Sequence, residues 1–371
     1  MNLSYWEYKS WLSNIDFTII GSGIVGLNCA LFLKKKFPKA KILVLEKGFL
    51  PQGASTKNAG FACFGSISEI LSDIDKTSET EVFQLVKKRV EGIQLLRDNL
   101  GDDDIGFENN GGHEIFLNNQ QDLFAHCCEY LTCINQLFHP IFKKDAFEIQ
   151  LNNYNFKGIY YQYITNLFES QIDTGKMMMS LLHKVQQQGV LVLNTISVLD
   201  FCDVNGNVSI QTSKFDLISK KLFIATNGFA AELVKEDIEP ARAQVLITKP
   251  IENLAIKGTF HLDEGYYYFR NIDNRILLGG GRNLDFVTER TTTFGETEIV
   301  QQKLECLLKE IILPQTNFEI EQRWSGIMGV GKNKKPIVKS ISENVFCGIK
   351  MGGMGIAIGS LIGKEMAELL E

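Results

Sequence analysis

The chain has 371 residues, of which 44% are hydrophobic and 22% charged, and its formal net charge is −6 at pH 7. This length is enough for one large or two medium domains with substantial cores. Lysine and arginine are spread along the chain rather than gathered in blocks, which argues against a nucleic-acid surface. We therefore expect a small-molecule partner.

The first 14 residues include Trp6 and Trp11 but lack the basic start and apolar core of a secretory signal. Eight cysteines are present, and none has histidines or other cysteines at metal-ligand spacing. We expect free, mostly buried thiols, no metal site and a cytoplasmic protein. The apolar run 17–33 contains three glycines and Asn28, so no membrane span is expected.

Residues 15–46 carry the strongest local pattern. An apolar strand over 15–20 leads into a G-x-G-x-x-G turn, a helix over 24–36, and a second apolar strand that ends at Glu46. In this order the glycines let the backbone approach a pyrophosphate at the helix N-terminus, and the carboxylate accepts a ribose hydroxyl. The pattern predicts an adenine dinucleotide site.

Further elements follow in chain order after a glycine-rich loop at 53–60. Helical periodicity predicts helices over 79–100, 122–138 and 176–188, and strands are expected over 112–117, 190–193 and 221–225. A hairpin is expected around Asn205-Gly206. The region 240–325 is rich in β-branched and aromatic residues and is predicted to be sheet. The tail combines a strand, a glycine cluster and a closing helix that starts near Ile356.

Nucleotide-type α/β elements thus occur at both ends and in the middle of the chain, and two insertions with a different residue pattern separate them. We expect a discontinuous cofactor domain built from residues 14–75, 165–230 and 325–371. The insertions, residues 76–164 and 231–324, would form a substrate-binding domain.

Together these pieces resemble the FAD-dependent superfamily of D-amino acid oxidase, glycine oxidase and sarcosine oxidase. Four landmarks occur in the family's order over nearly the whole chain: the dinucleotide turn with Glu46, the loop Gly53–Gly60, the strand end Ala225–Gly228, and Arg323–Ile327 followed by Pro336 and the terminal glycine cluster. The resemblance implies an α/β fold, with a discontinuous Rossmann-like FAD-binding domain and a mixed-sheet α+β substrate-binding domain.

The resemblance also implies FAD as the cofactor. The residues expected to bind it are Gly21, Gly23, Ile24, Gly26, Glu46, Lys47, Ser55, Thr56, Lys57, Asn58, Ala59, Gly60, Val198, Ala225, Thr226, Gly228, Gly326, Gly352, Gly353, Met354, Gly355 and Ile356. Some relatives attach the flavin covalently, through a histidine in the early glycine-rich loop or through a cysteine near the last third of the chain. Here Lys57 stands in that loop and no cysteine occurs in 328–336, so non-covalent FAD is expected.

The family oxidises a C–H bond next to an amine nitrogen and passes a hydride equivalent to flavin N5, after which dioxygen or another acceptor reoxidises the flavin. Tyr266 matches the family's substrate tyrosine, and Tyr268 and Arg270 share its strand face because side chains alternate. We take Tyr266, Arg270 and His113 as catalytic candidates, although a lone histidine beside a turn is more often structural. Tyr268, Arg282 and Met328 are the substrate-binding candidates.

Two departures from the family pattern affect the expected substrate and acceptor. The family's carboxylate-binding arginine is replaced by Met328, so either Arg270 or Arg282 grips a carboxylate or the substrate has none beside the reacting carbon. The lysine that assists oxygen activation in sarcosine oxidases is also missing, with Leu277 or a neighbour at its place. Oxidase and dehydrogenase activities therefore both stay open.

The first hypothesis is an FAD enzyme that oxidises an amine, such as an amino acid derivative, an N-methyl amine or a polyamine conjugate. The alternatives are a flavin-dependent 2-hydroxy acid dehydrogenase and a non-catalytic FAD-binding redox or partner module. A nicotinamide dehydrogenase, based on the first glycine turn alone, is the weakest.

Overall fold

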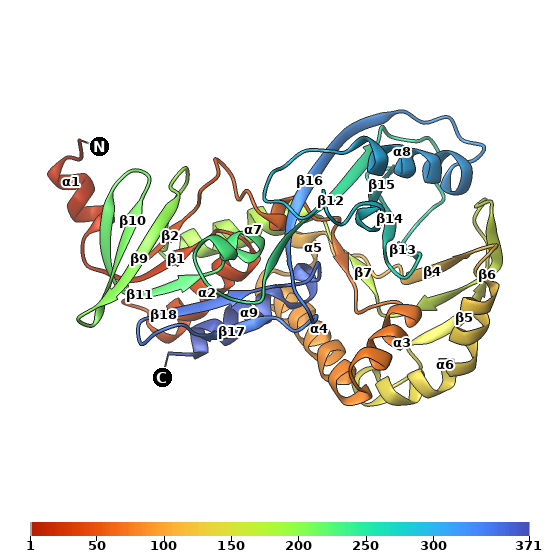
Figure 1. The fold of residues 1–371 in the computed structure, drawn as a ribbon, viewed down its shortest axis with the longest axis horizontal. Coiled ribbons are helices and arrows are strands. Elements are labelled where there is room, and N and C mark those ends of the chain that lie inside the picture. The colour runs from red at the N-terminus through yellow and green to blue at the C-terminus, as the bar shows by residue number, and fades with distance from the viewer. Residues whose placement is uncertain (1, 371) are drawn as a thin grey trace.

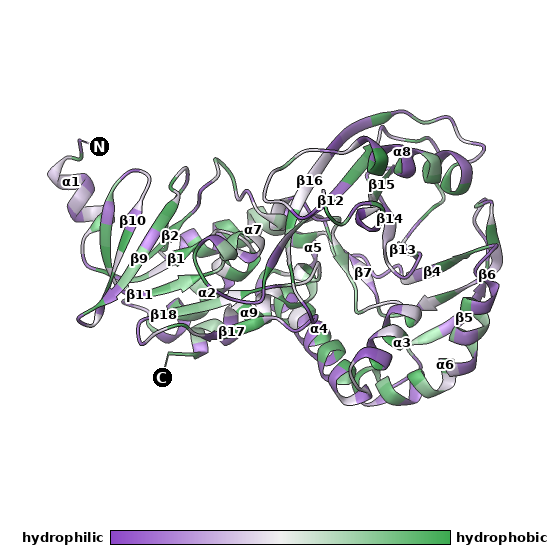
Figure 2. Cartoon of the chain, viewed as in Figure 1, coloured by the Kyte–Doolittle hydropathy of each residue, from purple (hydrophilic) through white to green (hydrophobic). Residues whose placement is uncertain are grey.

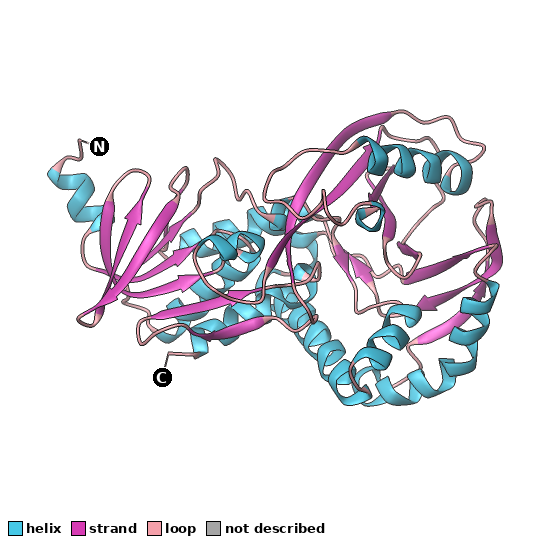
Figure 3. Ribbon diagram, viewed as in Figure 1, coloured by secondary structure: helices cyan, strands magenta, loops and turns pink. Residues whose placement is uncertain are grey.

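The computed structural model describes residues 2–370 and places their strands in two large sheets and one short ribbon. The first sheet lies at one end of the molecule and the second at the other, with several helices between them (Figure 1). Figure 3 shows the helices grouped beside the first sheet and along the outer side of the second. The arrangement confirms the expected α/β fold.

The first sheet has a parallel centre in the order β18–β11–β1–β2–β8. Its strands are β1 (Ile15–Ile20), β2 (Ile42–Leu45), β8 (Leu191–Leu193), β9 (Val198–Val204), β10 (Asn207–Thr212), β11 (Asp216–Ile224), β17 (Ile337–Ser340) and β18 (Val345–Ile349). β17 pairs antiparallel with β18, and the β9–β10 hairpin extends from β11. Carboxyl ends of parallel strands meet at one edge, which is where nucleotides bind in such sheets.

The helices are α1 (Tyr5–Glu7), α2 (Ile24–Lys36), α3 (Ile67–Lys76), α4 (Glu79–Leu100), α5 (Asp102–Ile105), α6 (Gln121–Phe142), α7 (Thr174–Gln187), α8 (Glu298–Leu307) and α9 (Gly355–Glu368). Helices α2 and α9 pack on each other and are largely hydrophobic in Figure 2. Their contact is close because a Cβ on Gly363 of α9 would lie 2.6 Å from the Val25 carbonyl oxygen of α2.

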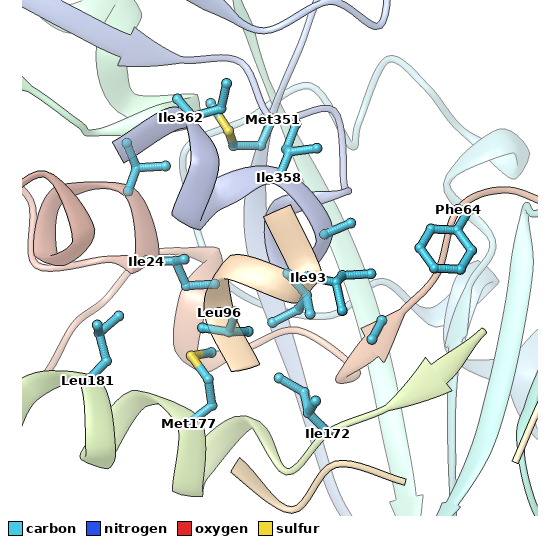
Figure 4. Packing of buried hydrophobic residues seen from close by; sticks show 14 of the residues in the cluster. Ile24, Phe64, Ile93, Leu96, Ile172, Met177, Leu181, Met351, Ile358 and Ile362 are labelled. Atoms are coloured by element: carbon cyan, nitrogen blue, oxygen red, sulfur yellow. The ribbon is translucent and has the colours of Figure 1, made fainter. Parts of the chain in front are cut away.

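One hydrophobic core unites α2, α4, α7 and α9. In Figure 4 the labelled side chains Ile24, Ile93, Met177 and Ile358, one from each of these helices, lie toward one another. This core fixes the start of α2 relative to the start of α9. Both of these helix starts face the cavity described below.

The second sheet runs in the order β16–β12–β15–β14–β13–β4–β6–β5. Its strands are β4 (Gly112–Leu117), β5 (Phe147–Leu151), β6 (Ile159–Asn166), β12 (Glu239–Thr248), β13 (Thr259–Leu262), β14 (Tyr267–Ile272), β15 (Arg275–Gly280) and β16 (Ile320–Val330). All neighbours are antiparallel except β13 and β4. The short β3 (Phe61–Ala62) and β7 (Ser170–Gln171) form the ribbon near the two sheets.

The boundaries of the two expected domains stay a prediction. All strands of the first sheet fall within the three segments assigned to the cofactor domain, whereas β6 and β16 of the second sheet run past the expected boundaries.

Helix α6 is longer than predicted because it continues through Pro140. A proline near a helix end removes one N–H donor without stopping the last turn. None of the helices in residues 2–370 has the length and hydropathy needed to cross a membrane.

Candidate active site

The glycine turn joins β1 to α2 as the sequence predicts. Gly21 has φ +99°, a left-handed conformation that favours glycine, and its N–H donates to the Leu45 carbonyl at 2.8 Å. A Cβ on Gly26 would lie 2.0 Å from the Gly21 carbonyl oxygen, so only glycine fits there. The glycines of the turn therefore let the backbone lie close to the first turn of α2.

Glu46 directly follows β2 beside this turn and is almost fully buried. Its Oε2 accepts the N–H and hydroxyl of Ser22 at 3.0 and 2.8 Å, and its Oε1 accepts the N–H groups of Gly48 and Gln52 at 2.9 and 3.2 Å. The carboxylate thus holds the glycine turn against the next loop. It also lines the cavity, where its expected role toward a ribose stays a prediction.

The loop Gly53–Gly60 is fixed by its own side chains and by β16. The Asn58 amide donates to the Ser55 carbonyl at 2.8 Å and accepts the Gly60 N–H at 2.8 Å. The Trp324 indole N–H donates to the Lys57 carbonyl at 3.0 Å, and Ser55 Oγ accepts the Ile24 N–H at 3.0 Å. These bonds tie the loop to both α2 and the second sheet.

The C-terminal glycine cluster lies between β18 and α9. Gly352 and Gly353 have φ +57° and +84°, and the Gly352 N–H donates to the Gly329 carbonyl at 3.0 Å. The Met351 N–H donates to Asn227 Oδ1 at 3.1 Å, which joins this cluster to the end of β11. The landmarks from the beginning, middle and end of the chain therefore converge.

A cavity of about 600 Å³ runs along these loops. Of the residues expected to bind a cofactor, those lining it are Gly21, Gly23, Ile24, Glu46, Lys47, Ser55, Lys57, Asn58, Ala59, Gly60, Val198, Ala225, Thr226, Gly326, Gly352, Gly353, Met354, Gly355 and Ile356. Gly26, Thr56 and Gly228 do not line it. Gly26 and Gly228 serve packing, because a Cβ on Gly228 would lie 2.3 Å from the Met328 carbonyl oxygen.

The cavity fits a long dinucleotide with a bulky ring. Two helix starts, those of α2 and α9, border it, and helix N-termini favour anionic groups. The hydroxyl of Thr226 is buried without a hydrogen-bond partner and belongs to the lining, as expected of a group reserved for a ligand. No cluster of three or more potential metal ligands occurs in residues 2–370.

The substrate candidates Tyr266, Tyr268, Arg282 and Met328 line the same cavity, on the side of the second sheet. Tyr266 is 42% exposed, and Tyr268 faces Phe61 at a ring separation of 5.5 Å. Burial raises the pKa of Tyr268 to about 12, so its phenol stays protonated. Tyr267 faces the opposite way into the core under α8, as alternation predicts.

The structure does not bring Arg270 to this cavity. It shares the strand face of Tyr268 and lies about 7 Å farther along β14, at about 3.3 Å per residue, whereas Tyr266 lies in the turn before β14. Its guanidinium packs under the loop, where a Cβ on Gly60 would lie 3.1 Å from Arg270 Cζ. Arg270 is 2% exposed, its Nε lacks a partner, and burial lowers its pKa to about 10.

His113 also lies away from the cavity, in a separate polar depression with Tyr154 and Lys257. The next residue, Glu114, points toward Ser68, so alternation along β4 turns His113 to the opposite sheet face. Its Nδ1 lies 2.9 Å from Thr165 Oγ1, and burial lowers its pKa to about 4. This placement favours the structural role over the catalytic one, which stays a prediction.

Sequence reasoning missed a buried group of charged residues at the substrate side. His261 lines the cavity, and its Nε2 lies 3.0 Å from Oε2 of Glu169. Burial opposes charge on His261, but Glu169 outweighs this effect and raises the His261 pKa to about 9. Burial also raises the pKa of nearby Glu114 to about 7. A third carboxylate, that of Glu69, lines the cavity itself.

Comparison with known proteins extends this picture. The chain is 23% identical over 381 residues to the probable oxidoreductase OrdL of Haemophilus influenzae, a match that covers 97% of this chain and 83% of that protein. The fold is similar to glycine oxidase from Geobacillus kaustophilus, with TM-score 0.77, 17% identity, and 95% and 94% of the two chains covered. It is also similar to L-proline dehydrogenase from P. horikoshii, with TM-score 0.74, 18% identity, and 96% and 93% covered.

Iminodiacetate oxidase from a Chelativorans species has the same fold, with TM-score 0.73, 16% identity, and 95% of each chain covered. The profile of one protein family, described as FAD dependent oxidoreductase (DAO), matches residues 16–369. That range contains every loop that borders the cavity. The chain therefore belongs to this family of FAD-dependent oxidoreductases, and it is an enzyme whose cofactor is FAD.

Proposed function

We propose that this enzyme oxidises a carbon–hydrogen bond next to an amine nitrogen, in an amino acid derivative, an N-methyl amine or a polyamine-type molecule. FAD, when bound, supplies the oxidation by accepting a hydride equivalent at N5 and is then reoxidised by dioxygen or another acceptor. Loss of the hydride turns the substrate C–N bond into the C=N bond of an iminium ion, and attack by water then gives a carbonyl compound, the freed amine and a proton. The chain's own residues bind and orient the substrate.

One observation supports this proposal above the others. The cavity continues past the glycine loops to the second sheet, where it is lined by Tyr266, Tyr268 and Arg282. The names of three similar structures, glycine oxidase, L-proline dehydrogenase and iminodiacetate oxidase, all refer to compounds in which an amine is bonded to a carbon that bears a carboxylate. An amine substrate is therefore favoured over a 2-hydroxy acid.

Tyr266 and Arg282 are the proposed substrate-binding residues. The Gly281 N–H donates to the Tyr266 carbonyl at 3.0 Å, so the two side chains come from adjacent backbone. The Arg282 guanidinium lies over the Phe286 ring at 4.7 Å, which leaves its donors available to a carboxylate. Because Met328 occupies the cavity where the family arginine is expected, Arg282 is the proposed replacement.

Anaerobic mixing of the holoenzyme with a panel of amino acids, N-methyl amines, polyamines and 2-hydroxy acids tests this function. We expect loss of the visible flavin absorbance with amines and none with hydroxy acids. Bleaching by hydroxy acids alone would establish the dehydrogenase alternative. Bleaching by dithionite but by no panel compound would instead indicate a non-catalytic flavin module. Peroxide release on exposure to air, compared with reduction of a dye, then identifies the acceptor.

The protonation state of the bound amine also bears on the proposal. A protonated amine has no free lone pair to drive hydride departure, so the bound amine must be neutral. The hydroxyl groups of Tyr266 and Tyr268 can donate and accept hydrogen bonds, and a hydroxyl does not favour the ammonium form as a carboxylate would. Their placement suits an amine that is oxidised in its neutral state.

A further inference from the structure

Glu69 occupies an unusual position between a helix start and the substrate side of the cavity. It is the third residue of α3, and its Oε2 accepts the Ser66 N–H at 3.2 Å in a capping box. The same carboxylate reaches the turn before β14, where a Cβ on Gly265 would lie 2.7 Å from Glu69 Cδ. Its half-buried side chain therefore lines the cavity beside Tyr266.

The other two carboxylates of this region already have partners. Glu169 pairs with His261 and accepts the Phe64 and Gly65 N–H groups at 2.8 and 3.1 Å. Glu114 accepts both the N–H and the hydroxyl of Ser68. Glu169 balances the charge of His261 by direct contact, and Glu69 adds a weaker attraction that also favours the protonated histidine. Because the His261–Glu169 pair carries no net charge, it does not neutralise the Glu69 carboxylate.

Glu69 itself makes no ion pair with any residue between 2 and 370. Its one side-chain hydrogen bond, from Ser66, leaves most of the acceptor capacity of the carboxylate unused. A half-buried carboxylate that faces a ligand cavity gains most from a cation, because removal from water weakens its hydration and strengthens the ionic attraction.

We propose that Glu69 binds a positively charged group of the substrate, other than the nitrogen that is oxidised. The substrate is then an amine that carries a second ammonium or guanidinium group, such as a diamine or an amino acid with a basic side chain. This inference rests on the proposed amine oxidation. A carboxylate beside the reacting nitrogen would favour its protonated form, which cannot release hydride, so the partner of Glu69 is a second cationic group.

Glu69→Gln tests the charge with little change in shape, since glutamine also serves in a capping box. The matched control is Asp75→Asn, which removes an exposed carboxylate from the same helix away from the cavity. The probes are two pairs that differ in one ammonium group: lysine with norleucine, and putrescine with butylamine. Perturbation of the flavin spectrum gives the affinity of each compound, and anaerobic bleaching gives the limiting rate of reduction.

We expect the wild-type enzyme and Asp75→Asn to bind the dicationic member of at least one pair about 10-fold to 100-fold more tightly than its partner, as for a charge-assisted hydrogen bond. Glu69→Gln should lose this preference and keep its affinity for norleucine and butylamine. Because the wild-type preference is measured first, the test holds even if the variant folds poorly.

Three binding results would overturn the inference: no preference in the wild-type enzyme, a preference retained by Glu69→Gln, or no spectral change with lysine or putrescine at millimolar concentration. A lower limiting rate with unchanged affinity would also overturn it, because that pattern belongs to a proton-transfer group. Failure of the proposed function looks different. In that case the binding preference persists while no amine bleaches the flavin.

Discussion

His261 Nε2 lies 3.0 Å from Glu169 Oε2, and both side chains are almost completely buried. The other oxygen of Glu169 accepts two backbone N–H groups from the segment that leads into α3. The pair therefore joins β13 of the second sheet to the segment that carries Cys63 and Glu69 into the cavity lining. It positions the substrate side of the site.

Removing one member of this pair is expected to destabilise the protein. Glu169→Gln leaves a buried imidazolium without its counter-charge, and loss of one partner of a buried ion pair costs about 3–5 kcal/mol. Denaturant unfolding of the holoenzyme measures the change. Glu319→Gln, which removes an exposed ion pair with Lys249, should change stability by at most about 1 kcal/mol. Equal stabilities for the two variants would contradict the prediction.

The same pair predicts a dependence of stability on pH. The folded-state pKa of His261 is about 9 and lies above its unfolded value of about 6.5. The pair's contribution is therefore fully present below the unfolded pKa and is lost as pH rises through the folded pKa. As the pH rises from below 9 to above 9, the free energy of unfolding of the wild-type enzyme should fall by more than that of Glu169→Gln. Parallel curves for the two proteins would show that the pair does not titrate there.

The nucleotide turn gives a third prediction, for Gly26→Ala. The added Cβ would meet the Gly21 carbonyl oxygen at 2.0 Å, so α2 must shift away from the turn. We expect a loss of about 1–3 kcal/mol in stability and a lower flavin-to-protein ratio after gel filtration. Gly175→Ala in α7 is the control, since its Cβ approaches only Asp173 Oδ1, at 3.3 Å. Wild-type flavin content in Gly26→Ala would refute the packing argument.

The sequence predicts the nucleotide-binding half of this site well because its signals are local. Gly21, Gly26 and Glu46 lie within one βαβ unit, whose order alone dictates how they meet. The helix over 79–100 and the strand over 112–117 also have the predicted bounds. These elements depend on periodicity and caps that lie within the segment itself.

The substrate side depends on distances that no local pattern contains. Alternation correctly places Arg270 on the face of Tyr268, but it does not show how far along that face the cavity extends. His261 and Glu169 meet although they are 92 residues apart, and this contact requires the register between β13 and β4. Ser66-x-x-Glu69 is predictable as a capping box, whereas its approach to Gly265 follows only from tertiary packing.

A fourth prediction concerns the attachment of FAD, which we expect to be non-covalent. Cys63 lines the cavity, but burial raises its thiol pKa well above the usual value, so the reactive thiolate is absent at neutral pH. Acid denaturation should release all of the yellow chromophore and leave a polypeptide of unmodified mass. Cys63→Ala should behave identically. Colour that remains on the wild-type chain but not on this variant would identify Cys63 as an attachment site.

The last prediction separates the two arginines that the sequence offers for a substrate carboxylate. Arg282 lines the cavity and has no ion pair within residues 2–370, so Arg282→Met should weaken binding of a carboxylate-bearing amine about 10-fold to 100-fold. The same amine without its carboxylate should bind equally to wild type and variant. Titration of the flavin spectrum under anaerobic conditions gives both affinities.

Arg270→Met should leave these affinities unchanged, because Arg270 lies under Gly60 and outside the cavity lining. Its buried charge has no ion-pair partner at Nε, and methionine fills a similar volume without that desolvated charge. The variant should therefore be as stable as the wild-type protein or more stable in denaturant unfolding. If Arg270→Met alone weakened binding of the carboxylate-bearing amine, Arg270 rather than Arg282 would be the residue that binds the carboxylate. Unchanged affinity in both variants would mean that neither arginine binds a carboxylate, and that the substrate has none beside the reacting carbon.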